Sequence, residues 1–148
     1  MNTNSLILLA ALIPVLLILG VITLKRWPRK LKVDKFANEW KELQGLCRDK
    51  GTWPAAIIDA DKFLDKALKR RKFKGKSMGE RIVSAQRKIS NNDQLWFAHN
   101  LAKKLKAEPA FRLKEADVKA ALIGFRGALR DLGALKPSES PQAKELEK

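Results

Sequence analysis

The densest group of chemically active side chains in this sequence is cationic. Cations near a helix end are favourable on their own account, because they complement the helix dipole. Their number here exceeds what capping requires, so the run predicts a surface that binds a polyanion. The alternative is a solvated or membrane-facing surface. Seven of the eleven residues from 66 to 76 are cationic: Lys66, Lys69, Arg70, Arg71, Lys72, Lys74 and Lys76.

A second group lies on one flank of a predicted helix. Trp96, His99, Lys103 and Lys106 are spaced i, i+3, i+7 and i+10. An aromatic ring beside cations can stack a nucleobase while the cations hold phosphates. The alternative is that the two rings pack at the edge of a bundle and the lysines are solvated. General acid–base catalysis by His99 would need a titratable partner, and its helical neighbours do not supply one.

Catalytic and metal-binding patterns are missing from the sequence. There is no Gly-rich phosphate loop, no His/Glu metal pair and no Ser-His-Asp set. Cys47 and His99 are the only residues of their types, which excludes an intrachain disulfide and a structural zinc site. Asp59, Asp61 and Asp65 are expected to form surface ion pairs. We therefore expect a protein with no catalytic residues, no metal and no cofactor.

The elements that must position these groups are all helices. No alternating apolar run bounded by turn residues predicts a strand. Apolar residues recur at helical spacing through residues 34–135, which predicts an all-α bundle of about five helices. The expected helices cover 34–50, 53–72, 78–89, 94–107 and 114–132.

Several residues are expected to begin helices or bring them together. Thr52 is predicted to cap the helix at 53–72, and Ser77 and Glu80 form a capping box. The last helix also carries a row of small residues, which allow another backbone to approach closely. Its partner is either a helix of the same chain or a second copy in a homodimer. The small residues are Ala116, Ala120, Gly124 and Gly127.

The N-terminal region is apolar. Residues Leu6–Leu24 carry no charge, and as a helix they would cover about 28 Å, close to the ~30 Å hydrocarbon core of a bilayer. A transmembrane helix is expected, and a cleaved signal peptide is the alternative. Because the cations follow the span, residues 25–148 are predicted to be cytoplasmic and the N-terminus external, in the inner membrane. The residues expected at the membrane interface, near anionic lipid headgroups, are Lys25, Arg26, Trp27, Arg29, Lys30 and Lys32.

The whole chain of 148 residues has a formal net charge of +15. Residues 33–135 alone contain 23 Lys or Arg and 13 Asp or Glu. A small domain this basic is typical of one with a polyanionic neighbour. The predicted organisation is an external N-terminus at 1–5, a transmembrane helix at 6–24, a basic collar at 25–33, the bundle at 34–135 and a disordered tail at 136–148.

Four motifs resemble a group of uncharacterised helical proteins from small-genome candidate-phylum bacteria. Those proteins usually have one N-terminal membrane anchor, and the likeness covers residues 34–135. They resemble in turn the HEPN domains, which are helical, often dimeric, and in active members cleave RNA. The motifs are WPAAIIDADKFLD at 53–65, GKSMGER at 75–81, DQLWFAH at 93–99 and ALRDLG at 128–133.

The chain departs from the HEPN R-x4-6-H signature. Ala102 and Ala107 stand where that group often has an Arg and a further His, and no Arg lies four to six residues before His99. The resemblance therefore implies the helical fold, dimerisation and an RNA-binding surface, but not the catalytic residues.

Together these features predict a membrane-anchored, non-enzymatic binding module. Its expected ligand is a polyanion, either RNA or anionic lipid, or an acidic protein. The alternatives are a divergent HEPN-like ribonuclease using His99 and a tethered interaction or dimerisation domain.

Overall fold

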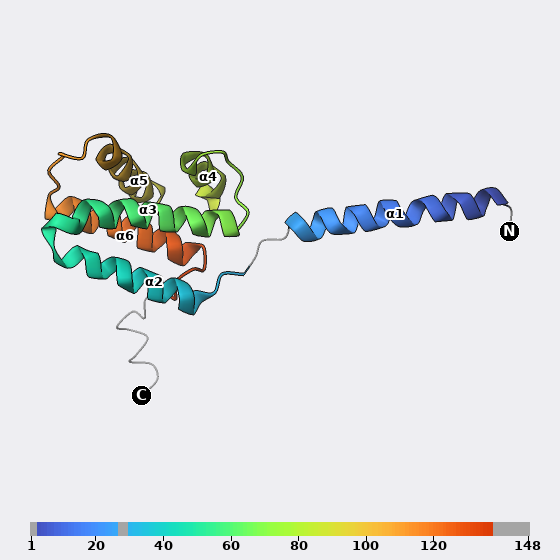
Figure 1. The fold of residues 1–148 in the computed structure, drawn as a ribbon, viewed down its shortest axis with the longest axis horizontal. Helices are drawn as coiled ribbons and strands as arrows, with labels where there is room; N and C mark the ends of the chain where they lie inside the picture. The colour runs from blue at the N-terminus through green and yellow to red at the C-terminus, as the bar shows by residue number, and fades with distance from the viewer. Residues whose placement is uncertain (1–2, 27–29, 138–148) are drawn as a thin grey trace, which may run out of the picture.

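The computed structural model describes residues 3–26 and 30–137, with the side chains of the first helix described from residue 11 to residue 24. The described residues form helices and connecting loops without a strand, which confirms the predicted all-α class and the helical bundle (Figure 1). The α-helices are α1 (Thr3–Arg26), α2 (Val33–Gly45), α3 (Trp53–Arg70), α4 (Met78–Ala85), α5 (Asn92–Ala107) and α6 (Glu115–Asp131). Short 3-10 turns cover Leu46–Arg48, Lys50–Thr52 and Gln86–Lys88.

Helix α3 lies at the centre of the bundle and contacts α2, α4, α5 and α6. Its apolar stripe is fully buried, as Ile57, Leu64 and Leu68 show. Leu95 of α5 and Phe125 of α6 belong to the same core cluster and are equally buried. Figure 1 shows α3 and α6 side by side, with α2 and α5 on opposite sides of them. Burial of these apolar side chains is the main favourable contribution to folding.

The start of α3 differs from the prediction. Helix α2 ends at Gly45 and the chain continues through two 3-10 turns, so the helix predicted to reach residue 50 is shorter. The Thr52 hydroxyl does not cap α3 but donates to the carbonyls of Leu46 and Asp49. An N-cap side chain usually requires extended backbone, whereas Thr52 is helical at φ −96° and ψ −3°. The predicted Thr52 cap is therefore wrong.

The cap of α4 agrees with the prediction. The Ser77 hydroxyl accepts a hydrogen bond from the Glu80 N–H at 3.2 Å. The Glu80 carboxylate reaches back and accepts from the Lys76 N–H at 2.7 Å. Both interactions satisfy donors near the helix start that would otherwise lack partners.

Gly124 accounts for part of the small-residue row on α6. A Cβ added there would lie 2.6 Å from the backbone oxygen of Gln94, at the start of α5. Gly124 therefore serves close packing within the chain. Gly127 has nothing within 4 Å of an added Cβ.

The structure contradicts the predicted membrane anchor. Within the described part of the chain, no helix combines the length and hydropathy needed to span a bilayer. The predictions of a transmembrane helix at 6–24 and of an inner-membrane location with a cytoplasmic domain are therefore wrong.

The six residues predicted at the membrane interface lie in sequence between the apolar run and the start of α2, and that role stays a prediction. Lys25 and Arg26 end α1, and the side chains of Lys30 and Lys32 are exposed. Trp27 and Arg29 lie outside the described residues, as does the predicted tail from residue 138 onward.

Candidate functional site

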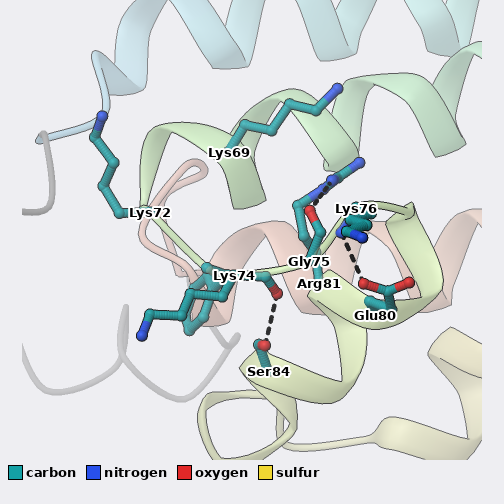
Figure 2. Close-up of a pocket in the computed structure, with 9 residues that line it drawn as sticks. Lys69, Lys72, Lys74, Gly75, Lys76, Glu80, Arg81 and Ser84 are labelled. Atoms are coloured by element: carbon teal, nitrogen blue, oxygen red, sulfur yellow. Dashed lines mark hydrogen bonds between the residues drawn. The ribbon is translucent and has the colours of Figure 1, made fainter. Parts of the chain in front are cut away.

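A surface pocket of about 730 Å³ lies where α3 ends and α4 begins. Figure 2 shows that the loop between the two helices forms one wall, and the first two turns of α4 form another. The pocket collects most of its lining from the predicted cationic run. Its lining residues are Lys69, Lys72, Phe73, Lys74, Gly75, Lys76, Glu80, Arg81 and Ser84.

Helix α3 ends in a Schellman motif that starts this loop. The Phe73 N–H donates to the Leu68 carbonyl at 3.2 Å, and the Lys72 N–H donates to the Lys69 carbonyl at 3.0 Å. This motif requires a left-handed residue directly after the C-cap, a place usually taken by glycine. Here Lys72 takes it, with φ +64°, the only non-glycine residue with positive φ in the described part of the chain.

Side chains of α4 hold the rest of the loop. The Ser84 hydroxyl donates to the Lys74 carbonyl at 2.7 Å, and Nη1 of Arg81 donates to the Gly75 carbonyl at 2.7 Å (Figure 2). The Lys76 N–H is held by Glu80, as described above. The backbone of Lys74, Gly75 and Lys76 is thus held in place by hydrogen bonds. The side chains of the two lysines are directed outward from this fixed backbone.

Gly75 is required by this frame. Its φ is +152°, in the region that favours glycine, and an added Cβ would lie 2.7 Å from the backbone nitrogen of Arg81. The loop therefore sits directly against the first turn of α4, with no room for a side chain at this position.

Arg81 links the loop to α3. Its side chain is almost completely buried, and its Nε donates to Oδ1 of Asp65 at 2.6 Å. Asp65 also pairs with Lys69 at 2.7 Å. Burial alone would raise the pKa of Asp65, but the hydrogen bonds and charges of Arg81 and Lys69 outweigh it and hold that pKa below its usual value. Asp65 is therefore ionised at neutral pH and pairs with both cations, offsetting one of their two positive charges.

The remaining three cations of the pocket have no such compensation. Lys72, Lys74 and Lys76 are exposed, and none makes an ion pair with the described residues. Lys72, Lys74 and Lys76 thus line one pocket from a short, fixed loop, and Figure 2 shows the side chains of Lys72 and Lys74 extending from the loop in different directions. This arrangement can bind several anionic groups, while the Glu80 carboxylate and the Ser84 hydroxyl of the same lining hydrogen-bond to the loop backbone.

The other members of the predicted run lie elsewhere. Lys66 donates to both carboxylate oxygens of Glu39 and lies 5.8 Å from the ring centres of Phe36 and Phe63. Arg70 and Arg71 are half-buried and do not line the pocket. The structure therefore brings Lys69, Lys72, Lys74 and Lys76 together, and separates Lys66, Arg70 and Arg71 from them.

The predicted flank on α5 is not an open surface. His99 is 7% exposed, and its Nδ1 lies 2.8 Å from Oδ1 of Asp61. Lys106 donates to the other oxygen of Asp61 at 2.9 Å. The Trp96 ring stands edge-on to His99 with their centres 5.8 Å apart, and only Lys103 of this group is exposed and unpaired among the described residues.

Comparison with known proteins gives no relative. No family model, curated protein or solved structure matches the chain. The resemblance to anchored helical proteins and to HEPN domains therefore stays an expectation, and the site has to be interpreted from its own geometry.

The sequence analysis did not identify Arg81 and Asp61 as buried residues, although their spacing from apolar residues indicated it. Arg81 follows Met78 by three residues and precedes Ala85 by four, which places it on the apolar face of α4. Asp61 lies in the same way between Ile57 and Leu64 on α3, where it is 2% exposed rather than on the surface as expected. A charge on the core face of a helix needs a buried partner, and this requirement predicts such pairs.

Proposed function

We propose that this chain is a non-enzymatic binding module for a phosphate-rich polyanion. The observation that supports this proposal most directly is the group of three uncompensated ammonium ions, Lys72, Lys74 and Lys76, around one pocket. Their loop is held by Arg81, Ser84 and Glu80 before any ligand arrives. A loop that is already ordered loses less conformational entropy on binding.

The backbone of Lys72 supports the same proposal. A left-handed conformation costs a residue with a Cβ about 1–2 kcal/mol, and glycine would avoid this cost. A strained position next to a candidate site is a reason to suspect function. Lysine at this position adds a third ammonium ion to the pocket, which glycine could not do.

A ribonuclease is the second candidate, and one observation bears on it. Asp61 next to His99 is the arrangement that orients a histidine base. However, His99 is nearly buried, and Nε2 lies 3.8 Å from the position of a Cβ at Gly79, beneath the first turn of α4. Access of a substrate to that nitrogen is therefore restricted, and we assign His99 and Asp61 to the support of the bundle.

The proposal is tested by binding of the intact chain to single-stranded RNA and to inorganic polyphosphate. The test variant replaces Lys72, Lys74 and Lys76 with Ser. The control variant replaces Lys41, Lys88 and Lys114 with Ser, since these lysines are exposed, lack ion pairs among the described residues and lie outside the pocket.

We expect the test variant to bind RNA on the order of 100-fold more weakly at 0.1 M salt. Each phosphate contact to a single strand contributes roughly 0.7 to the slope of log Kobs against log salt concentration, so the loss of three contacts lowers log Kobs by roughly two units at 0.1 M relative to 1 M salt. The control variant should bind almost as well as the wild type. Equal affinities for the two variants would contradict the proposal. Binding to anionic vesicles or polyglutamate without binding to either phosphate polymer would also contradict it.

A further inference from the structure

We infer that the ligand of the pocket is single-stranded nucleic acid, with one base stacked on Phe73 and the adjacent phosphates held by the loop lysines. This inference rests on the proposed function and narrows it. Its basis is that the cationic lining of the pocket also contains an aromatic ring.

The position of Phe73 follows from the end of α3. In a Schellman motif the residue at this place commonly packs against the last turn of the helix, and Phe73 packs accordingly against the core. It is only half-buried, however, and the rest of the side chain contributes to the pocket surface. The same motif that positions Lys72 thus fixes Phe73 beside it.

The residues next to Phe73 are lysines, which can bind the backbone phosphates of a nucleotide chain. The exposed lysines Lys72 and Lys74 flank the phenylalanine in sequence, and Lys76 follows on the same loop. Proteins that bind single strands combine a basic surface for the backbone with aromatic rings for the bases. The volume of about 730 Å³ is also within the usual range for a site that holds one small organic unit.

Other phosphate polymers would not use the ring. Inorganic polyphosphate has no planar group to stack, and a duplex keeps its bases stacked inside the helix. Stacking on Phe73 should therefore strengthen the binding of single-stranded nucleic acid but not that of polyphosphate or a duplex, because only a single strand has bases free to stack.

The experiment compares binding of single-stranded RNA, single-stranded DNA, duplex RNA and inorganic polyphosphate to the intact chain. Phe73→Leu removes the aromatic face but keeps an apolar side chain for the core, and Phe73→Tyr keeps the face. Phe111→Leu is the control, since Phe111 is also half-buried and lies 3.9 Å from a lysine nitrogen, but lines a different pocket.

We expect Phe73→Leu to weaken binding of single strands about fivefold or more, since stacking contributes about 1–3 kcal/mol per base. Phe73→Tyr should bind like the wild type, and polyphosphate binding should not change in either variant. The RNA and DNA measurements show which strand is preferred. Circular dichroism melting of each variant identifies losses that come from unfolding.

The inference is overturned if Phe73→Leu leaves binding of single strands unchanged, or if it weakens polyphosphate binding equally. A loss of the same size in Phe111→Leu would also overturn it. Single-strand binding that depends on the loop lysines but not on Phe73 would leave the proposed function standing without this inference. Binding of no phosphate polymer would remove both.

Discussion

At the scale of single residues, Lys72 occupies a backbone conformation in which glycine would make the fold more stable but would not supply an ammonium group. Its φ of +64° belongs to the region where glycine is favoured. The sequence instead supplies a lysine, whose ammonium group is exposed beside two others. Selection for stability alone would favour glycine here, so the position is informative about what the loop does.

The substitution Lys72→Gly should therefore separate stability from binding. We expect it to raise the free energy of unfolding by about 0.5–1 kcal/mol, because it removes the left-handed strain. The same change should weaken RNA binding roughly fivefold at 0.1 M salt, since one phosphate contact is lost. Urea denaturation and an RNA titration of the same preparation measure both effects. A variant that is more stable and binds RNA as well as the wild type would show that Lys72 makes no ligand contact.

Two of the residues that the sequence did not predict correctly, Asp61 and Arg81, have partners far away in the chain. Asp61 and His99 are 38 residues apart, and Arg81 and Asp65 are 16 apart. Helical spacing relates only residues three or four positions apart. It could therefore place Asp61 and Arg81 on core faces but could not name their partners. The lysines of the loop were predictable because their density is visible without any tertiary information.

At the scale of elements, helices were easier to predict than their ends. Apolar spacing indicated all five helices of the bundle, because each buries one stripe. The predicted cap at Ser77 was confirmed, while the one at Thr52 failed because two 3-10 turns precede α3. The pocket arises from the loop between α3 and α4, and its shape depends in part on the hydrogen bonds of Arg81 and Ser84 to the loop, which no sequence pattern predicted.

The packing of α5 on α6 gives a prediction with a control in the same helix. Gly124→Ala should lower the free energy of unfolding by about 1–3 kcal/mol, since its Cβ would overlap the backbone oxygen of Gln94. Gly127→Ala has free space and should be neutral or stabilising by up to about 1 kcal/mol, because alanine is the better helix former. Urea denaturation of both variants measures the difference. Equal effects of the two substitutions would contradict the close approach of α5 to α6.

At the scale of the whole molecule, charge is the dominant property. The net charge of +15 is spread over many exposed lysines and arginines, so weak attraction to any polyanion is expected. What distinguishes the pocket is that one fixed loop lines it with three exposed lysines that make no ion pair with the described residues. If the pocket is a specific site, its three lysines should contribute more to binding than three exposed lysines elsewhere. If binding is due to a diffuse basic surface, the two sets should contribute equally.

The salt dependence of RNA binding tests the central claim most directly. The slope of log Kobs against log salt concentration should be measured for the wild type, for the pocket triple variant and for the Lys41, Lys88 and Lys114 control. If the loop lysines contact phosphates, the pocket variant should lose roughly two units of slope, since each contact to a single strand contributes about 0.7. The control should keep the wild-type slope. Equal slopes for the pocket and control variants would contradict the account, because binding would then depend on overall charge and not on this site.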